Sequence, residues 1–172
     1  DKLLEQSELV FGEQGRGELV DVADGKGYFQ APVLLQVKDS ATATHVHEHE
    51  VFGPVASLLP YSGDAADASA LIAKGQGGLV SSIYTDDREF AATFLDGGAA
   101  FHGRLHFGSK KIAEHSMGPG TVLPQLVHGG PGRAGGGEEL GGLRGLSLYL
   151  QRTAVQGDEP MIARLAEGGA DW

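Results

Sequence analysis

The sequence predicts an α/β fold in which helices flank a mainly parallel sheet. Short runs of apolar, β-branched and aromatic residues alternate with segments of helical spacing, and strands joined through helices favour right-handed crossovers and parallel pairing. A length of 172 residues, with 41% hydrophobic and 21% charged residues, suits one packed domain. Twenty-eight glycines without a period indicate turns rather than repeats.

The N-terminal part is expected to hold a helix-like start and one strand. The opening DKLLEQSELVFG has helical spacing and no initiating Met, so we expect the chain to begin within a longer protein. Residues 28–37 are rich in strand formers, and Pro32 indicates an edge or entry position. Residues 55–61 form a second apolar stretch.

Two helices separated by a strand are expected in the middle of the chain. Asp64 is placed to cap a helix that runs to about Lys74. Residues 78–85, GLVSSIYT, predict a strand, after which Asp86 and Asp87 are placed to cap the second helix. The residues expected to face the core are Ala68, Leu71 and Ile72 in the first helix and Phe90, Phe94 and Leu95 in the second.

Two further strands, a glycine-rich segment and a short helix are expected towards the C-terminus. GRLHFGS, residues 103–109, and GLSLYLQRTAV, residues 145–155, have the composition of strands. Between them lies the glycine-rich segment 128–145. The last predicted element is a helix over 160–167, with Asp158 as its cap and a proline in its first turn.

Charge and composition narrow the partners. A net charge of −10 and a pI near 5.0 disfavour nucleic acid, whose backbone is bound mainly by Lys and Arg. The absence of cysteine excludes disulfides and thiolate nucleophiles within these residues. No apolar run is long enough to span a membrane, and the start lacks the order of a signal peptide, so the expected location is cytoplasmic.

Three histidines at alternate positions suggest a possible metal site. On a strand, His45, His47 and His49 would point to one side, close enough to share a zinc or copper ion. The residues between them, Val46 and Glu48, do not indicate a strand with one dry face. A metal-binding module and a solvated histidine run therefore both stand as interpretations.

Other catalytic patterns are weak. The glycine-rich segment lacks a following Gly-Lys-Ser/Thr, which argues against a phosphate-binding loop. Ser57, Ser116 and Ser147 lie outside any G-x-S-x-G elbow, so a serine triad is not indicated. Glu138 and Glu139 are adjacent, and their side chains are expected to diverge as a solvated pair rather than share acid and base roles.

Four stretches of the chain stand out together: GYFQAPVLL, HEVFGPVASLLPY, GLVSSIYTDD and HGGPGRAGGGEELGG. They resemble the C-terminal part of the aldehyde dehydrogenase family, in the family's order and over essentially the whole chain. The longer stretch that begins PQLVHGGPGRAGGGEELGG is similar to one subgroup, the CoA-thioester semialdehyde dehydrogenases of phenylacetate and benzoyl-CoA degradation.

The resemblance assigns roles to residues of the E-x-F-G-P motif. It implies that Glu50 accepts hydrogen bonds from the nicotinamide ribose of NAD or NADP, and that Phe52 packs near the nicotinamide ring. Gly53 and Pro54 would form the turn that presents both. His128 stands where many relatives carry an aromatic residue that lines the aldehyde tunnel, and GRLHFG replaces a stretch that usually carries an Asn.

The resemblance also implies parts of the enzyme that these residues lack. The family's cysteine nucleophile and glutamate base belong upstream of residue 1, so we expect an inactive fragment of an NAD(P)-dependent dehydrogenase that oxidises a CoA-linked semialdehyde to the acid. We expect residues 1–144 to belong to the catalytic domain, 145–157 to form an oligomerisation strand in a homo-oligomer, and 158–172 to be a C-terminal tail. A module that serves only assembly is a third interpretation.

Overall fold

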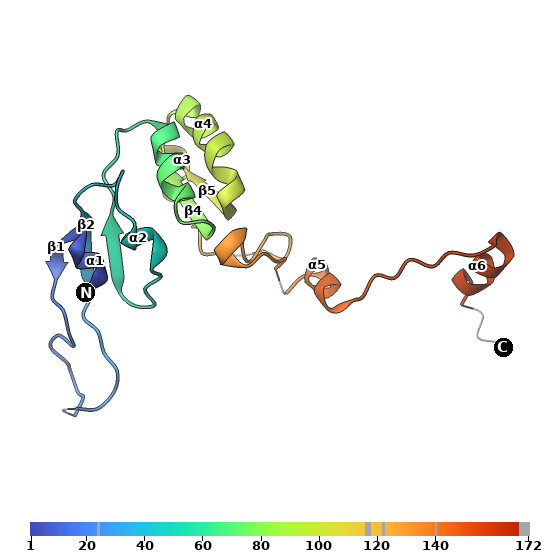
Figure 1. The fold of residues 1–172 in the computed structure, drawn as a ribbon, viewed down its shortest axis with the longest axis horizontal. Coiled ribbons are helices and arrows are strands. Elements are labelled where there is room, and N and C mark those ends of the chain that lie inside the picture. The colour runs from blue at the N-terminus through green and yellow to red at the C-terminus, as the bar shows by residue number, and fades with distance from the viewer. Residues whose placement is uncertain (24, 116–117, 122, 140, 169–172) are drawn as a thin grey trace.

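Figure 1 shows the computed structural model of the chain, which describes residues 1–23, 25–115, 118–121, 123–139 and 141–168. Two small sheets occupy the N-terminal two thirds of the chain, and residues 143–168 extend away from them (Figure 1). Ser116, weighed above as a nucleophile, and the end of the predicted tail lie outside the described residues.

The first sheet has three strands in the order β1-β2-β3, with bounds Ser7–Gly12, Val33–Val37 and Val55–Leu58. β2 pairs antiparallel with β1 and parallel with β3. The strand predicted over residues 28–37 begins only at Val33, directly after Pro32. Pro32 therefore has the predicted entry position, while β2 itself is the central strand and not an edge.

The prediction that the chain starts with helical structure is largely wrong. Only a single turn, α1 at Lys2–Glu5, is helical, and β1 follows at once. Because β1 is held by pairs such as Ser7 with Val37, about thirty positions further along, its strand conformation depends on partners that local spacing does not reveal.

The second sheet contains β4 at Gly78–Tyr84 and β5 at His102–Gly108, which pair in parallel. Helix α3, Ala65–Ala73, precedes β4, and helix α4, Arg88–Gly98, connects β4 to β5. Both strands, helix α3 and the start of α4 agree with the predictions to within one or two residues. Two of the three strand pairings in the described residues are parallel, which confirms the mainly parallel α/β class, although in two sheets rather than one.

The larger core lies where α3 and α4 cover the second sheet (Figure 1). Ala65, Ile83 and Phe94 are buried there, and Phe94 is only 5% exposed. The prediction that Leu95 faces the core is wrong, since it is 46% exposed on the outer side of α4. The partly buried residues that pack on this core are Ala68, Ile72, Phe90, Leu105 and Phe107.

The aspartates predicted to cap α3 and α4 differ in the structure. Asp87 is the N-cap of α4, and its carboxylate accepts hydrogen bonds from the backbone N–H groups of Glu89 and Phe90. Asp64 occupies the N-cap position of α3, but its side chain makes no capping hydrogen bond. Asp86 does not cap either, because its carboxylate instead binds the backbone N–H and the ammonium group of Lys110.

Towards the C-terminus, helical turns replace the start of a predicted strand, and the predicted helix is present. Residues 143–149, where a strand was predicted from Gly145 onward, form helix α5, Leu143–Leu146, and one 3-10 turn, and residues 150–157 belong to no helix or strand. Helix α6, Glu159–Ala166, agrees with prediction, and the Asp158 carboxylate accepts from the N–H of Met161 at 3.1 Å. Pairing of this segment with a second subunit remains a prediction.

Single 3-10 turns complete the elements. They are Ala99–Phe101 after α4, Lys110–Ile112 after β5, Gly132–Ala134 in the glycine-rich segment, and Ser147–Tyr149 after α5. Within the described ranges, no helix is both long and apolar enough to cross a membrane.

Candidate functional site

The three alternating histidines lie on a helical turn and not on a strand. Helix α2 spans His45–Glu48, and the side-chain Oε1 of Gln6 accepts hydrogen bonds from the backbone N–H groups of Thr44 and His45, each at 2.9 Å. This capping by a residue almost forty positions away starts the turn. The prediction that His45, His47 and His49 point to one side is therefore wrong.

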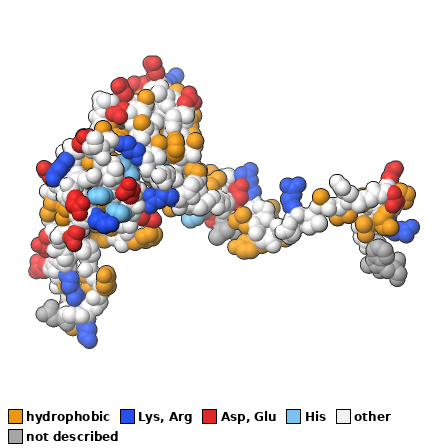
Figure 2. Space-filling model, viewed as in Figure 1, with side chains coloured by type: hydrophobic (Ala, Val, Ile, Leu, Met, Phe, Trp, Pro, Cys, Tyr) orange, Lys and Arg blue, Asp and Glu red, His pale blue; other side chains and the backbone are white. Residues whose placement is uncertain are grey.

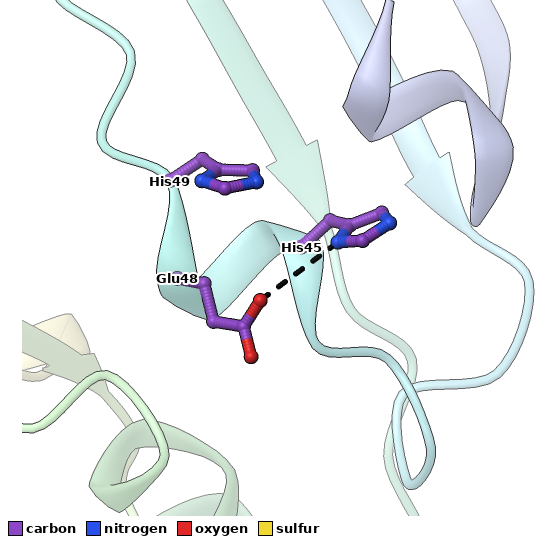
Figure 3. A group of neighbouring side chains, drawn as sticks. All are labelled: His45, Glu48 and His49. Carbon is purple, nitrogen blue, oxygen red and sulfur yellow. Dashed lines mark ion pairs between the residues drawn. The ribbon is translucent and has the colours of Figure 1, made fainter.

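On this turn His45, Glu48 and His49 form a cluster (Figure 3). The rings of His45 and His49 stack with centroids 5.6 Å apart. His45 Nε2 lies 3.1 Å from the Glu5 carboxylate, and its Nδ1 lies 3.9 Å from that of Glu48. In the space-filling view, histidine, acidic and basic side chains gather on this face around α2 (Figure 2).

The spacing of this cluster does not match an assembled metal centre. Zinc–nitrogen bonds of about 2.0–2.1 Å in a tetrahedron bring neighbouring ligand atoms to roughly 3.4 Å of one another. The 3.9 Å between His45 Nδ1 and Glu48 is wider, and the outer limit for the cluster is 4.8 Å. His47 does not join the group within the described residues, so the three histidines of the alternative, metal-binding interpretation do not come together.

His47 faces a different environment. Burial, with a smaller contribution from the positive charge of Lys74, lowers the pKa of His47 below its usual value. Its Nε2 is buried without a hydrogen-bond partner in the described part of the chain. A neutral imidazole with a free ring nitrogen is thus held beside the loop that follows α2.

Glu50 lines a cleft of about 250 Å³ between α2, the start of β4 and the glycine-rich segment. Glu50 is an exposed residue, so a ligand in this cleft has access to it. Side chains and backbone from three separate parts of the chain meet here, including His47, His49, Glu50, Gly77, Leu79 and Arg133.

Phe52 stands on the turn that follows. The N–H of Gly53 donates to the carbonyl of Val51 at 3.1 Å, and the carbonyl of Pro54 accepts from the N–H of Val33 at 2.9 Å, which joins the turn to the first sheet. Phe52 is 93% exposed and is not among the residues that line the Glu50 cleft. Its ring is therefore free to contact a ligand from outside the chain.

The glycine-rich segment packs backbone to backbone against the second sheet. A Cβ added at Gly103 would lie 1.8 Å from the carbonyl oxygen of Gly129, and one at Gly132 would lie 2.1 Å from that of Gln76. Gly132 also has a φ of +55°, which side chains disfavour. Close approach to the sheet, rather than phosphate binding, accounts for these glycines.

One charged side chain of this segment reaches the cleft. Arg133 donates from Nη1 to the carbonyl of His47 at 2.6 Å and from Nη2 to the carbonyl of Glu48 at 3.1 Å. Sequence reasoning missed Arg133, Gln6 and Glu5. The isolated cation among the glycines was a usable signal for Arg133, whereas nothing local singles out the other two.

His128 and the neighbouring pair Glu138 and Glu139 form a second polar group. His128 Nδ1 lies 3.3 Å from the carboxylate of Glu139, and Val127 forms a β-bridge with Glu138. The expectation of a solvated glutamate pair is wrong, because both residues are partly buried and the side chain of Glu139 is only 21% exposed. The aldehyde-tunnel role of His128 remains a prediction.

Comparison with known proteins places the chain in a family. The sequence profile of the aldehyde dehydrogenase family matches residues 5–155. Protein MaoC of Klebsiella aerogenes is 47% identical over 85% of this chain, and the 3,4-dehydroadipyl-CoA semialdehyde dehydrogenase of Aromatoleum evansii is 39% identical over 76%. The chain spans 42% and 25% of the lengths of these two relatives.

A solved structure gives the same result for the fold. The lactaldehyde dehydrogenase of Escherichia coli superimposes with a TM-score of 0.59 and 26% identity, over 88% of this chain and 27% of that one. The fold and the sequence therefore point to the same family independently of any single motif.

Proposed function

Because the chain belongs to the aldehyde dehydrogenase family, we propose that it forms the part of an NAD(P)-dependent aldehyde dehydrogenase that holds the nicotinamide ribose. The observation that carries the proposal is the Glu50 carboxylate at an open cleft, two residues before an exposed Phe52. The bound cofactor would supply the hydride acceptor. A carboxylate accepts hydrogen bonds from two neighbouring hydroxyls, and an exposed benzyl ring offers a flat face to a flat heterocycle.

The proposed substrate is a CoA-linked semialdehyde of aromatic degradation, which is oxidised to the carboxylic acid. The relative named as a 3,4-dehydroadipyl-CoA semialdehyde dehydrogenase supports this, together with the resemblance to the phenylacetate and benzoyl-CoA subgroup. His128 would line the aldehyde tunnel. Its contact with the carboxylate of Glu139, at 3.3 Å, makes this stretch polar, which suits a substrate that carries a polar thioester end.

Other parts of the enzyme are proposed to lie outside these residues. The chain has no cysteine, so the nucleophile would come from polypeptide beyond the 172 residues. We propose that residues 1–144 belong to the catalytic domain and that 145–157 extend a sheet of a second subunit in a homo-oligomer, with 158–172 as a tail. A cytoplasmic location is part of the same proposal.

Replacement of Glu50 tests the cofactor role. In the full-length enzyme, Glu50→Gln keeps the shape of the side chain but weakens its acceptance from ribose hydroxyls, so we expect the KM for NAD or NADP to rise about tenfold. Glu89→Gln, at an exposed position in the first turn of α4, is the matched control and should keep the wild-type KM. An unchanged KM in Glu50→Gln would refute the proposed role.

A further inference from the structure

We infer that Arg133 is a positioning residue for Glu50, because it fixes the turn from which the Glu50 loop departs. The inference rests on the proposed cofactor role of Glu50 and adds to it a second residue of the same cleft. Arg133 and Glu50 are 83 positions apart in the sequence and line the same cleft.

The contacts of Arg133 fall on the carbonyls that a helix leaves unpaired. The last carbonyl groups of a helix have no partner within it, and a positive charge at that end is favourable. The guanidinium group binds the carbonyls of His47 at 2.6 Å and Glu48 at 3.1 Å with two separate nitrogens. With Gln6 at one end and Arg133 at the other, both ends of α2 are held by distant side chains.

Arg133 is itself fixed to the second sheet. Its backbone N–H donates to the carbonyl of Gln76 at 3.1 Å, just before β4. A Cβ on Gly77 would lie 2.0 Å from the carbonyl oxygen of Pro131, so the two backbones are in direct contact there. The backbone of Arg133 is therefore restricted in its movement, and the two hydrogen bonds of its side chain restrict the movement of α2.

Glu50 lies close in the sequence to the two carbonyls that Arg133 binds. It is two residues beyond Glu48, and His49 between them has an extended backbone with φ −110° and ψ 111°. A second cation acts upstream, since Lys74 Nζ donates to the carbonyls of Ser40, at 3.2 Å, and Ala41. The segment from Ser40 to Glu48 is thus held near one end by the residue that follows α3 and near the other by the glycine-rich segment. The direction of Glu50 depends on the later contact.

The test is kinetic and is done in the full-length enzyme. For Arg133→Met we expect the KM of NAD or NADP to rise about tenfold, while kcat with saturating cofactor stays within about twofold of wild type. Arg133→Lys retains one charge but not the two-pronged donor, so its KM should lie between the two. The matched control is Arg144→Met, which removes an exposed arginine that donates to the carbonyl of Gln125 at 3.3 Å.

A second measurement does not depend on activity. In the 172-residue chain, hydrogen exchange of the amides from His49 to Val55 should be faster in Arg133→Met than in wild type, whereas the amides of β4 and β5 should be unchanged. If Arg133→Met does not fold, the KM and exchange rates of Arg133→Lys decide, and wild-type values for both overturn the inference.

The two proposals fail in different ways. A raised cofactor KM in Glu50→Gln with a wild-type KM in Arg133→Met overturns the positioning role and leaves the proposed function in place. A wild-type KM in Glu50→Gln overturns both. A loss of kcat in Arg133→Met without a change in KM also contradicts positioning through the ribose contact.

Discussion

The carboxylate of Asp87 accepts a hydrogen bond of 3.1 Å from the backbone N–H of Phe90, the third residue of α4. It also accepts from Glu89, so two otherwise unpaired donors of the first turn are satisfied. We predict that Asp87→Ala lowers the free energy of unfolding by about 1 kcal/mol. Urea denaturation of the purified chain measures it.

Asp64 offers the matched comparison. It occupies the same position at the start of α3 but makes no capping bond through its side chain. Asp64→Ala should therefore cost no more than about 0.5 kcal/mol. Equal losses in both variants would mean that the difference between the two caps has no energetic weight.

Removal of the Phe94 ring should lower stability strongly, whereas removal of the Phe52 ring should change it little. Phe94 is 5% exposed in the core between α4 and the second sheet, so Phe94→Ala should cost about 3–5 kcal/mol of stability. Phe52 is 93% exposed, and Phe52→Ala should change stability by less than about 0.5 kcal/mol. Thermal unfolding compares them, and a large loss in Phe52→Ala would show that its ring packs within the chain.

Stability should fall in acid because of His102. Burial lowers the pKa of His102 below its ordinary value of 6.5, partly offset by a backbone hydrogen bond with Gly98. The unfolded chain therefore binds the proton first as the pH drops below 6.5, so folding stability is intact above that value and declines beneath it. Unfolding followed from pH 7.5 to 5.5 should give a smaller decline for His102→Gln, and identical slopes would contradict the assignment.

The chain by itself should not oxidise aldehydes. Thiohemiacetal formation, which the family resemblance implies, requires a cysteine, and none is present among the 172 residues. Absorbance at the wavelength of the reduced nicotinamide should stay flat when the purified chain is mixed with NADP or NAD and a semialdehyde thioester. Turnover that persists after rigorous purification would contradict this.

The sequence was informative where local signals and long-range packing agree. GLVSSIYT and the following aspartates predict β4 and the start of α4 because strand propensity, the capping residue and helical spacing all act within a few positions. The E-x-F-G-P motif singled out Glu50, which lines a cleft, and its cofactor role remains a prediction. The prediction for Leu95 failed because successive residues on a helix point about 100° apart. The face that buries Phe94 therefore leaves Leu95 46% exposed.

The errors occur where a distant residue decides the local conformation. Alternating histidines resemble a strand, but Gln6 binds the N–H groups of Thr44 and His45 and turns the backbone into a helix. The stretch LSLYL has a strand's composition, yet no strand in the described residues pairs with it, so part of it forms helical turns. Neither outcome follows from short-range spacing.

The bridges made by Lys74 and Arg133 have a consequence for divergence among homologues. Both cations bind main-chain oxygen atoms, which every amino acid provides, so the side chains at positions 40, 41, 47 and 48 are free to drift without breaking the contacts. These contacts therefore constrain the identity of the two basic residues and not that of the residues whose carbonyls they bind. Methods that infer proximity from correlated substitutions would overlook both connections, although they tie together regions remote in sequence.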